Sequence, residues 1–373
     1  MAYDISTERR QQYREMSIRS QQRKRALLER DHSKRKIKVN VPRLSPSDLM
    51  PIIPPHGLSA LSLFSGGGGL DLGFERAGYN HVASFDILDV CGATLRANRP
   101  DWNVFSGEQT GDVTQVDWRA YRGVDLVHGG PPCQPFSIAG KQAGPNDPRN
   151  MWPAFVASVL AAKPKAFVAE NVPGLLDPKF KSFVDENVIS PLGRLYHLTT
   201  FRVGADEFGV PQTRKRVFIV GFRNAAHARR FARPTPTHSD EPGDLAPLNK
   251  TRHSLGLSNI GFDAVAPTLR SGFTGPRNTT GVVNSKASLL VWNKLRIWPN
   301  GVQHSRESAA VYPPENGHLR LSVPDCALLQ GFPCDWIFEG AVYQALGQIG
   351  NSVCPPVGYK VALAVARALG AIQ

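Results

Sequence analysis

Between residues 58 and 222, short apolar runs alternate with stretches of helical composition. The apolar runs lie at 60–64, 81–86, 124–128, 164–171 and 216–222. Each run has the length of a single buried strand. Alternation of this kind is typical of α/β proteins, in which helices cover a mostly parallel sheet. We therefore predict a doubly wound, mostly parallel sheet over 58–222.

The rest of the chain differs from this segment in composition. Residues 1–40 contain no glycine or proline and favour a helix, whereas 41–57 are rich in proline and are typical of a linker. Residues 223–319 are rich in Pro, Gly, Thr and Asn, which predicts a smaller, loop-rich second domain. Periodic structure returns over 320–373. We therefore expect four parts, 1–57, 58–222, 223–319 and 320–373.

The positive charge of the chain lies in two of these parts. Lys and Arg total 44 and Asp and Glu total 31, so the net charge is +13. Residues 1–57 carry 13 basic against 6 acidic residues, 223–319 carry 12 against 6, and the remainder carries 19 of each. This zoning favours two regions that bind a polyanion such as nucleic acid. The alternative is a solvated basic surface.

The cysteine pattern and the apolar content bear on the cellular compartment. The 5 cysteines are scattered and include no CxxC pair, which predicts neither a disulfide framework nor a zinc site. No apolar run is long enough to cross a membrane, and the N-terminus lacks the apolar core of a signal peptide. We expect a cytoplasmic protein with no bound metal and no membrane partner.

A cysteine between prolines follows the run at 124–128, in the sequence GGPPCQPFS. The prolines make the chain leave the strand as a rigid elbow, which presents Cys133 at the carboxyl end of the strand. Ligands bind at that edge of open α/β sheets. A buried cysteine that only fills the core is the alternative. We interpret Cys133 as a nucleophile because other segments supply the groups that a thiolate here would need.

Three features predict a pocket for a nucleoside cofactor. The first apolar run leads into FSGGGG and then a helix, so backbone amides can approach a ligand closely. Asp86 ends the second run, where a carboxylate commonly binds ribose hydroxyls. Asp112, in GDVTQV, is placed to accept from an adenine amino group. A plain tight turn and a helix N-cap at Asp86 are the alternatives.

Charged side chains follow the later apolar runs. Glu170 and Asn171 end the run at 164–171, and a carboxylate buried there requires a partner or a proton. Gln212, Arg214 and Arg216 stand at alternate positions, which share one face of an extended chain. We expect the two guanidinium groups to offset Glu170 and to bind a substrate carbonyl.

Taken together, these motifs resemble those of the cytosine-C5 DNA methyltransferases. FSGGGG, GGPPCQPFS, ENV, QTRKR, LSVPDCALLQGFP and QIGNSV occur in the order that this family uses, and the match covers nearly everything from residue 58. The resemblance implies the S-adenosylmethionine-dependent methyltransferase fold. It also implies a target-recognition domain at 223–319 and a catalytic domain, 58–222, that residues 320–373 complete.

The resemblance implies DNA (cytosine-5-)-methyltransferase activity with a role for each catalytic residue. Cys133 would attack C6 of cytosine, because C5 is too weak a nucleophile to take a methyl group until the covalent adduct makes it enamine-like. Glu170 would engage N3 and the amino group. Arg216 would bind the base carbonyl and orient Glu170, with Arg214 and Gln212 nearby.

Cofactor and DNA contacts are also implied. The match assigns S-adenosylmethionine contacts to Phe64, Gly66, Gly68, Asp86, Asp112, Val113, Pro131, Asn351, Ser352 and Val353. We expect DNA contacts from Gln134, Ser137, Gln212, Arg270, Arg277 and Asn278. Arg270 and Arg277 lie in a glycine-rich stretch, where arginine reads guanine or touches phosphate only.

The predicted substrate is double-stranded DNA from which the target cytosine is flipped out. The resemblance is to bacterial restriction-modification enzymes, so we expect a monomer on DNA, associated with the nucleoid, and a restriction endonuclease that cuts the same site. One alternative is a tRNA methyltransferase, although the CFT tripeptide of that lineage is absent, since Gly272 precedes Phe273 and Thr274. A DNA-binding regulator on a methyltransferase scaffold is the other.

Overall fold

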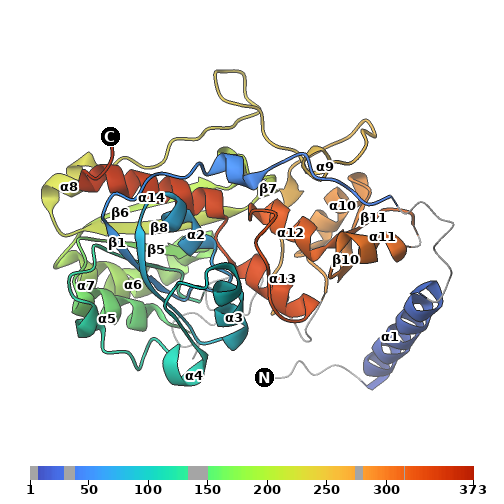
Figure 1. Cartoon of the computed structure of the whole chain (residues 1–373), viewed down its shortest axis with the longest axis horizontal. Helices are drawn as coiled ribbons and strands as arrows, with labels where there is room; N and C mark the ends of the chain where they lie inside the picture. The colour runs from blue at the N-terminus through green and yellow to red at the C-terminus, as the bar shows by residue number, and fades with distance from the viewer. Residues whose placement is uncertain (1–6, 29–37, 133–149, 274–279, 315) are drawn as a thin grey trace.

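The computed structural model describes residues 7–28, 38–132, 150–273, 280–314 and 316–373. Five predicted site residues therefore lie outside the described residues, namely Cys133, Gln134, Ser137, Arg277 and Asn278. Figure 1 shows a sheet-centred first lobe on the left and a smaller second lobe on the right. No helix in the described ranges is both long and apolar enough to cross a membrane.

The first lobe is built on a seven-stranded sheet in the order β3-β2-β1-β4-β5-β8-β6. Its strands are β1 (Ser59–Leu63), β2 (Asn80–Asp86), β3 (Val104–Ser106), β4 (Leu126–Gly129), β5 (Ala166–Asn171), β6 (His197–Gly204) and β8 (Lys215–Phe222). The first five strands of this order are parallel, and β8 runs antiparallel to both β5 and β6. The predicted doubly wound, mostly parallel sheet is confirmed.

Helices cover both faces of the sheet. They are α2 (Gly69–Arg76), α3 (Asp89–Asn98), α4 (Gly107–Thr110), α5 (Trp152–Ala162), α6 (Lys181–Val184), α7 (Ser190–Gly193), α8 (Ala225–Arg230) and α14 (Pro355–Leu369). Successive residues of β5 enter opposite cores: Ala166 and Val168 pack with α2 and α14, whereas Phe167 and Ala169 pack with α5. A strand buried on both faces explains its continuous apolar sequence.

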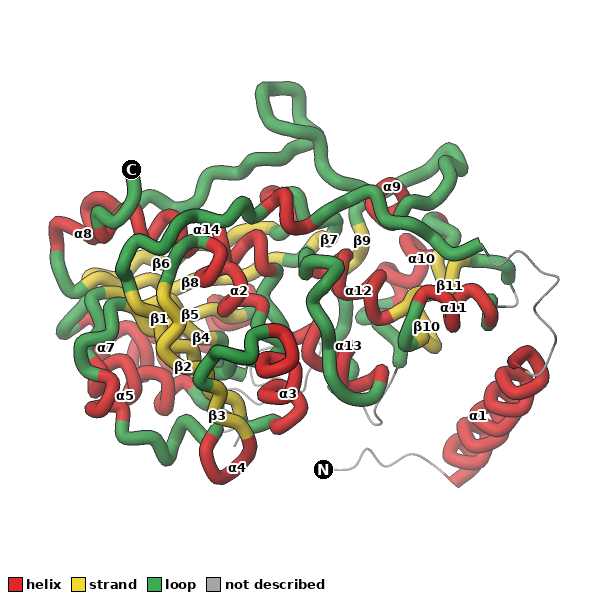
Figure 2. The backbone as a smooth tube through the Cα atoms, in the orientation of Figure 1, coloured by secondary structure: helices red, strands yellow, loops and turns green. Residues whose placement is uncertain are grey.

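The second lobe comprises short elements joined by loops (Figure 2). They are α9 (Thr251–Ser254), β9 (Ala266–Pro267), α10 (Lys286–Lys294), β10 (Ile297–Gln303), α11 (Arg306–Val311) and β11 (Leu319–Ser322). β9 pairs with β7 (Gln212–Thr213), and β10 pairs with β11. Since α8 packs against α14 and β11 belongs to the β10 pair, this lobe begins after α8 and ends with β11.

The C-terminal segment returns to the first lobe through α12 (Val323–Gln330), α13 (Val342–Asn351) and α14. α14 lies directly on α2, where a Cβ added to Gly73 would meet the backbone nitrogen of Tyr359 at 2.5 Å. Tyr79 Oη donates to the carbonyl oxygen of Ala362 at 3.1 Å. The last residues of the chain are therefore part of the first lobe.

Two N-terminal elements precede the sheet. The basic helix α1 (Thr7–Leu28) stands apart from both lobes (Figure 1). Residues 38–57, which we call the strap, run along both lobes and include a short 3₁₀ turn at Pro46–Leu49. Met50 of the strap is fully buried. The segment expected to be a linker therefore has fixed contacts with the rest of the protein.

Candidate active site

A pocket of about 700 Å³ opens at the carboxyl ends of β1, β2, β4 and β5. This is the edge at which open α/β sheets bind ligands. The pocket collects most of the predicted site residues: Phe64, Gly66, Asp86, Asp112, Val113, Pro131, Glu170, Arg216, Asn351, Ser352 and Val353. Gly68, Gln212 and Arg214 are not among the residues that line it.

The glycine turn between β1 and α2 has a left-handed backbone. The φ angles are 55° at Phe64, 56° at Gly66 and 80° at Gly68. A Cβ added to Gly66 would meet nothing closer than the oxygen of Phe64 at 4.0 Å, so this residue leaves space open to the pocket. A Cβ on Gly68 would instead meet Leu95 at 2.7 Å and Trp336 at 2.8 Å. Gly66 suits a ligand, whereas close packing accounts for Gly68.

The two predicted cofactor acids have backbone partners. Asp86 accepts hydrogen bonds from the amides of Gly66 at 2.8 Å and Leu88 at 2.9 Å, and burial raises its pKa. The carboxylate of Asp112 accepts from the amide and hydroxyl of Thr114, which lowers its pKa. Asp86 therefore fixes the glycine turn, and Asp112 fixes the loop that follows α4. Both remain in the pocket wall.

The segment 351–353 forms the opposite part of this wall. A Cβ on Gly69 would meet the oxygen of Val353 at 2.1 Å, so the glycine turn touches this segment. Arg214 donates to the oxygen of Gly350 at 2.7 Å and to that of Ser352 at 3.1 Å. Gln330 donates to the same oxygen of Ser352 at 2.6 Å. Two buried side chains thus hold the segment in place.

Glu170 and Arg216 form a buried ion pair at the end of β5. Arg216 Nε lies 2.6 Å from Glu170 Oε1, and the side chains are 12% and 9% exposed respectively. Burial raises the pKa of Glu170, while Arg216 and Arg214 oppose the shift. The pair forms because β8 is antiparallel to β5, which brings the start of one strand beside the end of the other.

The chain that leads to Cys133 is fixed beside this pair. Asn171 Nδ2 donates to the carbonyl oxygen of Pro131 at 3.0 Å, and a Cβ on Gly130 would lie 2.8 Å from Glu170 Oε2. Cys133 follows Pro132 directly in the sequence. The residues that directly precede the predicted nucleophile therefore lie beside Glu170.

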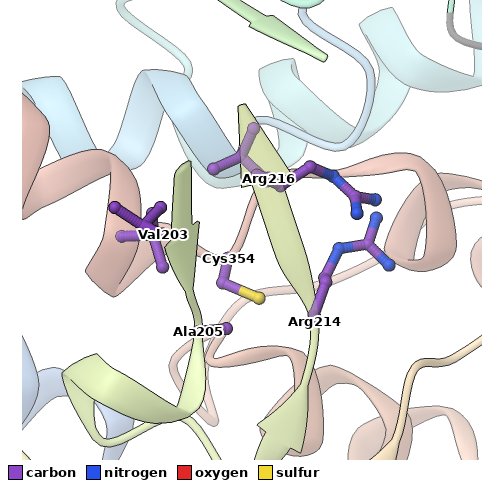
Figure 3. A pocket seen from close by; sticks show the side chains of 7 residues that line it. Val203, Ala205, Arg214, Arg216 and Cys354 are labelled. Atoms are coloured by element: carbon purple, nitrogen blue, oxygen red, sulfur yellow. The ribbon is translucent and has the colours of Figure 1, made fainter. Parts of the chain in front are cut away.

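Gln212 and Arg214 point to the interior. Gln212 is fully buried; its amide nitrogen donates to Leu329 O and Gln330 Oε1, and its amide oxygen accepts from Leu269 N. The expected DNA contact of Gln212 is therefore corrected: the side chain is buried, and both ends of its amide bind other residues of the protein. Figure 3 shows a second, smaller pocket, in which the guanidinium groups of Arg214 and Arg216 lie side by side and Cys354 lies to one side of them. Arg214 holds backbone in place and does not line the pocket of about 700 Å³.

The sequence interpretation missed several residues at this site. Phe273 of the second lobe lines the pocket, next to α13. Ser84, Ser62 and His128 form a polar row across β2, β1 and β4, and all are buried beneath α2. The polar residues within these apolar strands were the only signal. Arg270, for which we expect a DNA contact, is half-buried, and its backbone amide donates to the oxygen of Val282.

Comparison with known proteins identifies the family. The model of the C-5 cytosine-specific DNA methylases matches residues 58–367. The chain belongs to this family. The match covers the sheet, the second lobe and the returning C-terminal helices of this DNA methylase, and it begins just after the strap.

Curated relatives of this DNA methylase are type II methyltransferases. M.NgoMIV of Neisseria gonorrhoeae is 35% identical over 326 residues, which cover 83% of this chain and 98% of the relative. M.Eco47II of Escherichia coli is 32% identical over 347 residues, covering 84% and 80%. The fold is similar to that of a putative DNA modification methyltransferase from an Escherichia coli prophage, with a TM-score of 0.56, 22% identity and coverage of 84% and 100%.

Proposed function

We propose that this methylase transfers a methyl group from S-adenosylmethionine to C5 of a cytosine flipped out of a specific duplex DNA sequence. The observation that carries the proposal is one pocket whose wall contains the glycine turn, Asp86 and the buried Glu170–Arg216 pair. Asp86 is the carboxylate that we expect to bind the ribose. Family membership makes cytosine the base. The pocket volume of about 700 Å³ suits a nucleoside cofactor beside a base.

In this proposal Cys133 forms a bond to C6 of the base while Glu170 supplies a proton or hydrogen bond to N3. Negative charge that develops in the ring is thereby relieved, and C5 becomes nucleophilic. After methylation, a base removes the proton from C5, and the thiolate leaves C6 as the ring double bond re-forms. Arg216 orients Glu170 and binds the base carbonyl. Its charge also offsets the carboxylate when Glu170 is ionised.

The residues of the pocket fit the cofactor. The open space over Gly66 admits a ligand close to the backbone, and Asp86 lies at the end of β2, where ribose hydroxyls bind. Phe64, Val113, Pro131 and the segment 351–353 supply the remaining walls. S-adenosylmethionine supplies an electrophilic methyl group when bound. The protein residues hold the cofactor and exclude water from the reacting atoms.

The substrate we propose is double-stranded DNA, methylated by a monomer as part of a restriction-modification system. The basic second lobe supplies phosphate contacts, and their binding energy offsets the free energy needed to flip the base out of the duplex. The relatives named as type II methyltransferases support a role in protecting DNA from an endonuclease that cuts the same site.

Bisulfite sequencing of DNA from cells that express the protein tests this function. We expect one short sequence to retain cytosine throughout the genome, and cells that express Cys133→Ala to show none. Absence of a methylated sequence in the cells with the unaltered protein would refute the proposal. Once the sequence is known, a duplex with 5-fluorocytosine at the target position and S-adenosylmethionine should become covalently attached to the protein, because fluorine blocks removal of the C5 substituent.

A further inference from the structure

The basic helix α1 has no place in the reaction described above. It contains 7 Lys and Arg and 2 Glu among its 22 residues, a net charge of +5. Its apolar residues do not gather on one face. The side chains that the structure describes there are exposed, except that of Arg23, which is half-buried. A helix of this kind has no apolar stripe with which to join a core.

The strap, which follows α1 in the chain, binds the second lobe. We call residues 1–37, which precede the strap, the arm. Arg43 N and Leu44 N donate to the oxygen of Ser254 at 3.1 and 3.3 Å. The carbonyl of Val41 occupies the space above Gly256, where a Cβ would lie only 1.6 Å from it. The anchor of the arm is therefore a close backbone contact with α9.

A buried carboxylate strengthens the same anchor. Asp325 is fully buried, and its Oδ1 accepts from Asn40 Nδ2 at 3.0 Å and from Arg306 Nε at 2.7 Å. Asn40 also donates to the oxygen of Leu255 at 3.1 Å. Removing one partner of a buried charge is costly, so this junction of strap, α11 and α12 has one preferred arrangement.

The other end of the strap is fastened to the first lobe. Arg76 Nε donates to the oxygen of Met50 at 2.8 Å, and Ile53 N donates to the oxygen of Arg76 at 2.8 Å. His56 N donates to the oxygen of Gly78 at 3.2 Å. The strap thus runs between α2 and α9. Its N-terminal end lies on the second lobe, and α1 precedes this end in the chain.

α1 lies beyond the second lobe, past α11 and away from the catalytic sheet (Figure 1). Arg23 is near enough to Arg320 of β11 to contribute to the lowered pKa of that arginine, whose main cause is burial. α1 therefore adds its positive charge to this end of the molecule, where a partner of opposite charge would be attracted.

We propose that α1 binds the phosphate backbone of duplex DNA that flanks the target site, outside the part that the two lobes contact. This proposal rests on the proposed function, because DNA is then already held against the second lobe. A helix of 22 residues is about 33 Å long, close to one turn of duplex DNA. The family match begins at residue 58, so the arm is an addition to the shared catalytic unit.

The test compares DNA binding by the full-length protein and by a variant carrying Arg14→Gln, Arg19→Gln and Arg25→Gln. These three side chains are exposed. Affinity is measured over a range of salt concentrations on non-specific duplexes of about 14 and about 40 base pairs, because the longer one offers more than two further turns of duplex beyond the shorter one. A variant with Gln11→Ala, Gln12→Ala and Gln22→Ala is the matched control, because it alters the same helix without changing its charge.

On the long duplex, we expect the arginine variant to bind at least about tenfold more weakly than the unaltered protein, with a salt slope smaller by about 2.7 if all three arginines touch phosphate, since each lost contact removes about 0.9. On the short duplex the two proteins should bind alike, and the glutamine control should match the unaltered protein on both. Equal losses on both duplexes would overturn a flanking site, and an unchanged slope would overturn phosphate binding altogether. Bisulfite sequencing with the unaltered protein tests the proposed function separately.

Discussion

The buried pair of Glu170 and Arg216 shows how one side chain fixes the chemistry of another. Burial favours the protonated form of Glu170, whereas Arg216 Nε, 2.6 Å away, favours the carboxylate. The two effects act in opposite directions on a single group at the pocket wall, and burial is the larger, so the pKa of Glu170 is raised. A substrate that binds there and excludes water would shift the balance towards the acid.

At this position Glu170→Gln should lower the rate of methyl transfer at least about 100-fold, because an amide keeps the shape of the side chain but cannot exchange a proton in the reaction. Transfer of labelled methyl groups to genomic DNA measures the effect. Unaltered DNA affinity, determined on the same preparations, would show that the loss lies in the chemical step. A rate within a few-fold of the original would contradict the assigned role.

His128 gives a prediction about pH and stability. It is buried in β4 and stacks on Phe74 with 4.4 Å between ring centroids, and burial lowers its pKa to about 4. Its folded pKa lies below the ordinary value of about 6.5. The unfolded chain therefore binds the proton more tightly, and stability present above about pH 6.5 is lost as the pH falls towards 4.

The variant His128→Leu should reduce this acid sensitivity. Between pH 7.5 and 5, its free energy of unfolding should fall by about 2 kcal/mol less than that of the unaltered protein. Urea denaturation at the two pH values measures the difference. The control is His304→Gln, which replaces an exposed histidine and should leave the pH dependence as it was. Identical losses in the His128→Leu variant and the unaltered protein would count against the buried neutral state.

At the scale of elements, the interface between the lobes depends on glycines of α13. A Cβ on Gly350 would lie 2.5 Å from Cα of Ser271 and 2.6 Å from its nitrogen, so the second lobe touches α13 through backbone. Backbone atoms cannot move aside as a flexible side chain can. The contact requires a residue without a side chain at this position of the helix.

We expect Gly350→Ala to lower the free energy of unfolding by about 1–3 kcal/mol through this overpacking. Gly193→Ala is the matched control, because no atom lies within 4 Å of its added Cβ. Urea denaturation of both variants provides the comparison. Equal stability of the two variants would show that the lobes separate without cost at this point.

Sequence patterns predicted the elements that are buried on both faces and missed those that are short or half exposed. β5 and β8 are continuous apolar runs, and both were predicted. β3 has only 3 residues, and the first half of β6 is mostly exposed. The carboxyl ends of the predicted strands also located Asp86, Glu170 and the turn before Cys133.

Sequence patterns did not predict which polar side chains form hydrogen bonds within the protein instead of binding a ligand. The family resemblance led us to expect Gln212 at the DNA, yet its partners Leu329 and Gln330 lie more than a hundred residues away in the sequence. Hydrogen bonds across such distances leave no periodic trace in the sequence. The structural role of Arg214, which donates hydrogen bonds to the carbonyl oxygens of Gly350 and Ser352, was missed for the same reason.

At the scale of the whole molecule, the strap joins parts that are distant in the chain. It bonds to Ser254 and Leu255 at one end and to Arg76 and Gly78 at the other, and Met50 is buried between. The strap therefore contributes to the stability of both lobes.

Two truncations distinguish the strap from the residues before it. Removing residues 1–37 should leave the midpoint of thermal unfolding within about 1 °C, because this deletion spares the strap. Removing 1–57 should lower the midpoint by about 5 °C, since it exposes the surface that Met50 covers and leaves Asp325 without Asn40. Differential scanning calorimetry distinguishes the two. Equal midpoints for both truncated proteins would show that the strap adds no stability.

The wall formed by residues 351–353 has a consequence during protein synthesis. The glycine turn at 64–69 is synthesised long before the segment at 351–353 that closes the pocket around it. A product that stops short of α13 therefore lacks one wall of the pocket, so the site is assembled only after both lobes have been made.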